Sequence, residues 1–367
     1  MKRVLHPLVL VLGLASVALP GAASASGVKS PWQLHLLEAC QSERFVEKTK
    51  TQAAAGDVEA MAALGYLYSE ACGVPWDAEE AVRLWLAAAR AGQADAMASL
   101  GYVYGEGIGV EEDPAEAIRW TRAAAEKGNV RGIFNLGVSY DVGLGVAQDK
   151  TEAIRWYQAA VAQGDTDAMH NLAILYLRGE GVEKNEQEAV RLWRRAADLG
   201  DPASMAQLGA MAYWGKGGEK DVKAALRWWR AAADKGEASA MFFVGLLYET
   251  GEGVAMDDAE ALKWIRKAAD REDPNAMVNM GLRFIGGRGV NRDPRQARRW
   301  WLAAADKGSG DAMYYLGMLY SDGDEGVPED QGAAVKWLRQ AAQSGNAEAA
   351  RVLRQSGIGV VAPADVM

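Results

Sequence analysis

The chain has 367 residues, half of them hydrophobic, and its 49 acidic side chains outnumber 40 basic ones. Such a chain can bury a sizeable core, but an acidic balance without a basic run argues against nucleic acid or an anionic membrane surface as a partner. The length alone would suggest two or three globular domains, an estimate that does not apply to an array of internal repeats.

Residues 1–25 have the pattern of a cleavable signal peptide. Lys2 and Arg3 supply the positive start, an apolar stretch runs from Leu8 to Leu19, and small residues lead up to Ala25. The apolar stretch is short for a membrane span of about 20 residues, which favours cleavage over anchoring. We therefore expect cleavage after Ala25, a periplasmic or secreted location, and no integral membrane segment in the mature chain.

Residues 26–56 are predicted to form a lead-in helical segment, because their last part imitates the end of the repeats that follow. They contain Cys40, and the only other cysteine, Cys72, lies in the predicted turn of the first repeat. In an oxidising compartment an isolated pair is a disulfide candidate, and adjacent repeats place such turns along one edge. We predict a Cys40–Cys72 disulfide; the alternative is two buried, unpaired thiols.

From residue 57 the sequence repeats every 36 residues. One column holds glycine in seven copies and Ala173 in the other; its glycines are Gly65, Gly101, Gly137, Gly209, Gly245, Gly281 and Gly317. Leu, Met and Tyr columns stand around it at helical spacings, which predicts a first helix whose small residues allow a close neighbour. A Gly-rich turn follows, and the eighth copy has one inserted residue.

A second helix is predicted in each copy. It follows an acidic or amide column that can cap its free N–H groups: Asp77, Asp113, Asp149, Asn185, Asp221, Asp257, Asp293 and Asp330. Its apolar column is mostly tryptophan: Trp120, Trp156, Trp228, Trp264, Trp300 and Trp337, with Leu84 and Leu192. A closing glycine, replaced once by Glu272, can adopt the left-handed conformation that ends a helix.

The pattern A-M-x-x-L-G-x-x-Y, then G-x-G-V-x-x-D, then A-x-x-W-x-x-A-A-x-x-G, resembles the Sel-one-like repeat, a branch of the tetratricopeptide-like helical repeats. The resemblance implies an all-α solenoid, an α/α superhelix of eight helical hairpins, in which each hairpin buries its apolar face against its neighbours. The eight hairpins span residues 57–92, 93–128, 129–164, 165–200, 201–236, 237–272, 273–308 and 309–345. Residues 346–367 are expected to form a capping helix and a flexible tail.

The sequence gives little support for catalysis. The mature chain has only two histidines, His35 and His170, which lie far apart in the array. The single Ser-x-x-Lys match, from Ser26 to Lys29, has no partner motifs, so a β-lactamase-like hydrolase is the least favoured reading. Two thiols without histidine partners do not make a zinc site. We expect no enzymatic activity, no cofactor and no metal site.

The outward side of the first helices is the predicted binding groove, because it points away from the Leu, Met and Tyr core stripe. Amides there could bond to the backbone of an extended peptide, and aromatic residues could contact its side chains. The predicted backbone contacts are Asn135, Asn171, Gln207 and Asn279, and the predicted side-chain contacts are Phe134, Phe242, Phe243, Tyr314 and Tyr315. The alternative is that the amides bond to neighbouring helices and the aromatic residues pack between them.

The family resemblance implies a scaffold or adaptor. We expect an exported protein that binds a protein or extended peptide segment in this groove, with envelope regulation or assembly as the implied setting. The alternative is a glycan- or peptidoglycan-binding repeat protein, which would show aromatic faces alternating with carboxylates in the groove.

Overall fold

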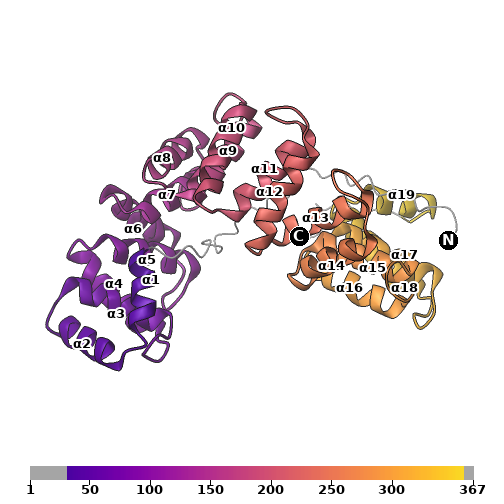
Figure 1. Ribbon diagram of the computed structural model, residues 1–367. Helices are drawn as coiled ribbons and strands as arrows, with labels where there is room; N and C mark the ends of the chain where they lie inside the picture. The colour runs from indigo at the N-terminus through magenta and orange to yellow at the C-terminus, as the bar shows by residue number, and fades with distance from the viewer. Residues whose placement is uncertain (1–30, 359–367) are drawn as a thin grey trace. The chain divides into compact units, whose positions relative to one another are not determined.

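The structure, a computed structural model, describes residues 31–358 and contains nineteen α-helices in that range (Figure 1). The predicted signal peptide, residues 1–25, and residues 359–367 of the predicted tail lie outside the described residues. Between residues 31 and 358 there is no strand apart from an isolated bridge between Asp324 and Val327. The predicted all-α solenoid with a lead-in segment and a terminal cap is confirmed.

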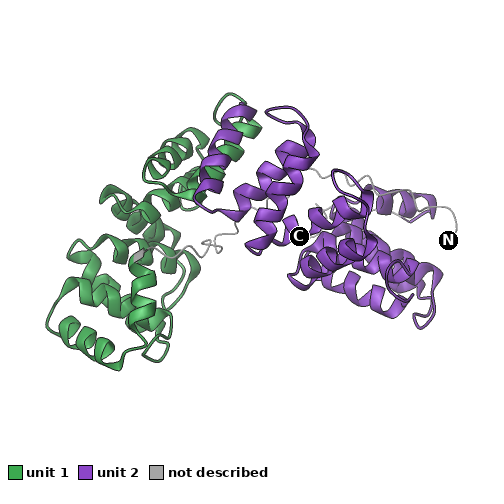
Figure 2. Ribbon diagram, viewed as in Figure 1, with its two compact units in different colours: residues 1–184 green, residues 185–367 purple. Residues whose placement is uncertain are grey.

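The chain forms two compact units, residues 1–184 and residues 185–367 (Figure 2). The helices of unit 1 are α1 Pro31–Ala39, α2 Glu43–Ala54, α3 Val58–Ser69, α4 Ala78–Arg90, α5 Ala94–Glu106, α6 Pro114–Glu126, α7 Val130–Val142, α8 Lys150–Ala162 and α9 Thr166–Arg178. Those of unit 2 are α10 Glu186–Asp198, α11 Pro202–Trp214, α12 Val222–Asp234, α13 Ala238–Thr250, α14 Asp258–Asp270, α15 Pro274–Gly286, α16 Pro294–Asp306, α17 Gly310–Asp322, α18 Gln331–Gln343 and α19 Ala347–Gln355. Within each unit a helix packs chiefly against its neighbours in sequence.

The predicted helix boundaries have the expected chemical causes. Every second helix of a hairpin begins after an aspartate or asparagine whose side chain accepts from backbone N–H groups of the first turn, as Asp77 does from the N–H of Glu80 at 2.9 Å. The closing glycines have positive φ, and Glu272, the one exception, takes the same conformation with φ of 65°. The aspartate and asparagine caps satisfy N–H groups that the start of a helix would otherwise leave unpaired, and the left-handed residues end the helices.

The glycine column of the first helix is explained by the residue it faces. An added Cβ at Gly65 would lie 2.7 Å from Nε1 of Trp85, and one at Gly137 would lie 2.7 Å from the Tyr157 ring. Trp85 also donates from its indole N–H to the carbonyl oxygen of Ala62 at 3.2 Å. The two helices of a hairpin therefore approach closely because one of them has no side chain at the contact.

The facing residues form a column that we call the inner column. It lies one residue after the tryptophan column that the sequence pattern singled out, and it consists of Trp85, Thr121, Tyr157, Trp193, Trp229, Ile265, Trp301 and Leu338. Each of these side chains is at most 5% exposed. The tryptophan column is less deeply buried at Trp156, Trp228, Trp264, Trp300 and Trp337, so the second helices pack most deeply one residue after it.

A second glycine sets the contact between consecutive hairpins. Gly109, in the turn between α5 and α6, has φ of 70°, and an added Cβ would lie 2.6 Å from the carbonyl group of Ala78 at the start of α4. Gly73 makes a similar close contact with the lead-in segment, since an added Cβ at Gly73 would lie 2.7 Å from the carbonyl oxygen of Cys40. The lead-in segment therefore packs on the first repeat much as one hairpin packs on the next.

Gly245→Val tests the close approach within a hairpin. An added Cβ at Gly245 would lie 2.6 Å from Cγ1 of Ile265, so we expect the free energy of unfolding to fall by about 2 kcal/mol in chemical denaturation. Gly218→Val is the matched control, because no atom lies within 4 Å of its added Cβ, and it should change stability by less than about 0.5 kcal/mol. Equal losses in the two variants would contradict the packing argument.

Candidate binding surface

The predicted groove residues all lie on first helices. Phe134 and Asn135 are on α7 and Asn171 is on α9, in unit 1. The members in unit 2 are Gln207 on α11, Phe242 and Phe243 on α13, Asn279 on α15, and Tyr314 and Tyr315 on α17. Their burial and contacts divide them into residues that support the fold and residues that are open to a partner.

Phe242 belongs to the core. Its side chain is 1% exposed, which corrects the expectation that it faces a partner. The matching residues Ala62, Ala98 and Val278 are also buried, whereas His170, Ala206 and Tyr314 in the same column are half-buried, so the burial of this column differs between hairpins. Phe134, in the same column, is 9% exposed but lines a pocket described below.

Phe243 and Tyr315 are half-buried by stacking on the inner column of the preceding hairpin. The ring of Phe243 lies 4.7 Å from Trp229 at an interplanar angle of 20°, and that of Tyr315 lies 5.2 Å from Trp301 at 19°. Burial, together with the carboxylate of Asp311, raises the pKa of Tyr315 to about 12. One face of each ring is therefore already occupied within the chain.

Two of the predicted amides take part in internal networks. The side-chain N–H of Asn171 donates to the hydroxyl of Tyr157 at 3.3 Å, and that hydroxyl donates to Asp141 at 3.1 Å. The side-chain oxygen of Asn279 accepts from Nε of Arg283 at 3.0 Å. The alternative, in which these amides bond to neighbouring helices, has direct support at Asn171, whose partner Tyr157 lies on α8, whereas the partner of Asn279 lies on the same helix, α15.

The other two amides are free. Neither the side chain of Asn135 nor that of Gln207 makes a hydrogen bond to any residue in the described range 31–358, and both are half-buried. A half-buried amide in contact with solvent keeps its donor and acceptor capacity for another molecule. Asn135 also stands at the edge of a pocket.

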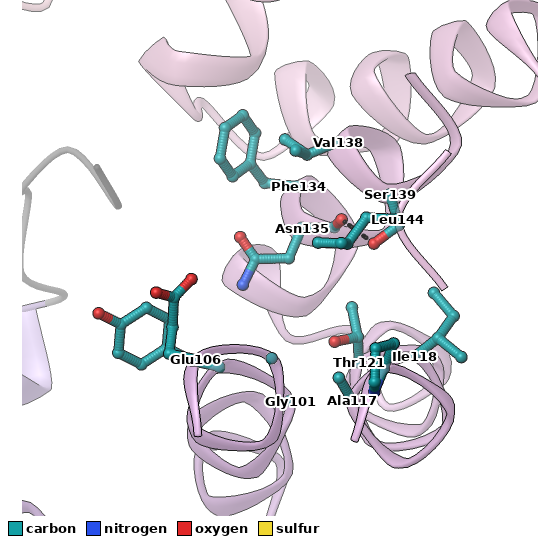
Figure 3. Close-up of a pocket in the computed structure, with 13 residues that line it drawn as sticks. Gly101, Glu106, Ala117, Ile118, Thr121, Phe134, Asn135, Val138, Ser139 and Leu144 are labelled. Atoms are coloured by element: carbon teal, nitrogen blue, oxygen red, sulfur yellow. Dashed lines mark hydrogen bonds between the residues drawn. The ribbon is translucent and has the colours of Figure 1, made fainter. Parts of the chain in front are cut away.

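This pocket lies between α5 and α7, with α6 at its floor, and has a volume of about 100 Å³ (Figure 3). The wall is largely apolar. The lining residues are Gly101, Tyr102, Gly105, Glu106, Pro114, Ala117, Ile118, Thr121, Phe134, Asn135, Val138, Ser139 and Leu144. Tyr102 and Leu144 are among the large apolar side chains that the chain leaves exposed.

Two small side chains create the pocket. Thr121 stands in the inner column, where the other hairpins hold Trp, Tyr, Ile or Leu. Ser139 stands in a first-helix column that is otherwise filled by Leu, Val, Met or, once, Arg283, and its hydroxyl donates to the carbonyl oxygen of Asn135 at 3.0 Å. The pocket is thus the space that a larger side chain occupies elsewhere in the array.

Glu106 is the one charged residue in the pocket wall. It makes no ion pair with a residue between 31 and 358, and no lysine or arginine lines the pocket. Burial and the nearby Glu106 carboxylate raise the pKa of Tyr102. The pocket therefore combines an apolar wall with a negative charge that has no cation beside it.

Reasoning from the sequence named Phe134 and Asn135 but missed the pocket itself. Thr121 is the residue that could have revealed it, because it is the one small polar residue in the inner column. The neighbouring tryptophan column is also apolar and obscures this signal in the sequence.

The described residues show no group of three or more histidine, cysteine, aspartate or glutamate side chains that could hold a metal ion. Among the same residues, no helix combines the length and the apolar character needed to cross a bilayer. Ser26 and Lys29, the Ser-x-x-Lys match, lie outside the described range.

The fold and this surface define a tandem helical-hairpin repeat protein. Its sequence matches the Sel1 repeat in eight consecutive segments, residues 58–93, 94–129, 130–165, 166–201, 202–237, 238–273, 274–309 and 310–346. The chain therefore belongs to the Sel1 repeat family. Proteins of this family are generally scaffolds for protein interactions, and the comparisons indicate no catalytic family.

Two solved structures resemble the chain closely. One is c5321, a protective antigen of uropathogenic Escherichia coli strains with an SLR fold: identity is 30%, the TM-score is 0.64, and the match covers 84% of this chain and 67% of that one. The other is a Sel1 repeat protein from Oxalobacter formigenes, with 34% identity, a TM-score of 0.61, and coverage of 71% and 99%. No curated protein sequence gives a significant match.

Thr121→Trp tests the origin of the pocket. The new indole enters an inner-column position that faces Gly101, the pairing found at Trp85 and Gly65, and buries apolar surface that is now open. We expect the free energy of unfolding to rise by about 1–2 kcal/mol in chemical denaturation. Thr151→Trp, at an exposed position of α8, is the control and should give no such gain. A loss of stability in Thr121→Trp would show that the space cannot accept an inner-column residue.

Proposed function

We propose that the chain is a scaffold that holds an extended segment of a protein partner against its first helices. The observation that carries this proposal is the pocket between α5 and α7, which opens beside the free amide of Asn135 (Figure 3). A free amide can both donate to and accept from an extended backbone, while a neighbouring pocket receives a side chain. This combination matches what a peptide offers at successive residues.

The proposed contacts are of two kinds. Asn135 and Gln207 offer complete amides to the partner's backbone, whereas Asn171 and Asn279 offer only the part of the amide that their internal bonds leave free. The proposed side-chain contacts are the pocket face of Phe134 and the outer sides of the half-buried rings Phe243, Tyr314 and Tyr315.

Glycan or peptidoglycan binding is the second candidate. Tyr102 beside Glu106 favours it, because a sugar site combines an aromatic face with a carboxylate. The faces of Phe243 and Tyr315 that stack on Trp229 and Trp301 cannot receive a sugar ring. A peptide partner is therefore favoured over a glycan. Binding of the chain to a glycan array would favour the glycan instead.

Export to an oxidising compartment, periplasmic or extracellular, is also part of the proposal. It is supported by the placement of Cys40 and Cys72, whose Cα atoms lie 5.8 Å apart, within the range that a disulfide spans. Such a bond would join the lead-in segment to the turn between α3 and α4. Disulfides persist in oxidising compartments.

Asn135→Ala tests the peptide-binding proposal. Peptides selected on the full chain from a displayed random library serve as probes, and their affinities are measured by fluorescence anisotropy. Loss of one hydrogen bond should weaken binding about fivefold, with little change in melting temperature because the amide has no internal partner. Asn275→Ala, an exposed asparagine at the start of α15, is the control and should bind normally. Failure to select any peptide, or normal binding by Asn135→Ala, would contradict the proposal.

The double variant Cys40→Ser/Cys72→Ser tests the disulfide. The two cysteines are 32 residues apart, and a bond closing such a loop contributes about 3–4 kcal/mol, which the variant should lose in chemical denaturation. A reducing agent should produce a similar loss in the parent chain and none in the variant. Two titratable thiols in denatured parent protein, purified from an oxidising compartment, would refute the bond.

A further inference from the structure

The pocket occurs at one hairpin because that hairpin lacks its own inner side chain. In six other hairpins the inner column is filled by Trp, Tyr or Leu, and in one by Ile265. At Thr121 the facing residues are also small, since Gly101, Gly105 and Ala117 all contribute to the wall. The space therefore has the dimensions and the apolar lining of a site built for a large hydrophobic side chain, but no residue of the hairpin fills it.

The negative charge in the wall has no role in holding the fold. Glu106 is the last residue of α5, where the helix dipole already places partial negative charge and a carboxylate is unfavourable. This end of the pocket therefore attracts a cation and repels an anion.

We propose that this pocket is a specificity site for a hydrophobic–basic pair in the partner segment. A large apolar side chain of the partner enters the space beside Thr121 and packs against Phe134 and Val138. A neighbouring lysine or arginine pairs with Glu106 at the rim. This inference rests on the proposed function, since it names the residues that the bound segment must carry.

The geometry favours this chemistry over the alternatives. An acidic segment would bring its charge to Glu106 with no lysine or arginine in the wall to compensate. A purely apolar side chain would bury part of the Glu106 carboxylate without giving it a partner, which costs free energy. The free amide of Asn135 stands at the same edge and can bond to the backbone of the residue that enters.

The test uses Thr121→Trp, Glu106→Gln and two matched controls. Thr151→Trp adds the same indole at an exposed site of α8, and Glu126→Gln removes a carboxylate from the exposed end of α6. A displayed random heptapeptide library is selected on the full-length protein. The enriched peptides are then measured against all four variants by fluorescence anisotropy at low and high salt.

We expect enriched peptides to share a large apolar residue next to lysine or arginine. Their affinity should fall about tenfold or more in Thr121→Trp, because the anchor loses its pocket. It should fall about threefold in Glu106→Gln at low salt and less at high salt, because the ion pair is partly screened. The two control variants should bind as the parent does.

Three results would overturn the inference, and they are distinguishable from one another. Peptides that bind Thr121→Trp as tightly as the parent would remove the pocket from the binding site while leaving the proposed scaffold function in place. Enriched peptides without a basic residue, whose binding is unchanged in Glu106→Gln, would remove the ion pair and also leave the scaffold function in place. If no peptide is enriched on the parent protein, both the inference and the proposed function fail.

Discussion

In most hairpins the contact between a bare glycine on the first helix and a large side chain on the second helix organises the helix pair; Ala173 replaces the glycine once and Thr121 replaces the large side chain once. Because the glycine has no Cβ, the facing indole or phenol can lie directly on the helix backbone, as at Gly65 with Trp85 and Gly137 with Tyr157. The indole also donates to a carbonyl oxygen of the first helix, for example from Trp229 to Ala206 at 3.0 Å. Close approach, burial of a large ring and satisfaction of its polar atom are thus achieved at one place.

This contact also explains where the protein can differ between copies. The residue at the close contact on the first helix stays small, glycine in seven copies and Ala173 in the other, because its size determines how closely the two helices meet. The facing residue can change size, because a smaller one leaves a pocket and does not disrupt the helix pair. Thr121 is such a change, and the pocket beside Phe134 and Asn135 is its direct result. A feature of one hairpin can therefore carry specificity while the scaffold around it is constant.

Much of the fold could be predicted from the sequence. The 36-residue period, the aspartate caps and the closing glycines each have a local physical cause, so they could be read from the residues without knowledge of the neighbours. The sequence could not predict which face of a second helix packs most deeply. The tryptophan column of a second helix and the column after it are both largely apolar, because the second helix packs against the first helix of its own hairpin and against the next hairpin. Helical periodicity alone does not say which of two adjacent apolar columns faces the closer neighbour. The same limit applies to Phe242, whose column is buried in some hairpins and half-buried in others.

The turn glycines impose a different kind of constraint. Gly109 holds a left-handed backbone conformation against the carbonyl group of Ala78, and Gly145 does so against that of Pro114. Any side chain at such a turn would be strained by its own φ and would push the preceding hairpin away. At these two turns the separation of consecutive hairpins is therefore set by contact with the backbone, which a substitution on a helix face leaves in place. Side chains on the helix faces can therefore vary from one hairpin to the next while the separation set at these turns stays the same.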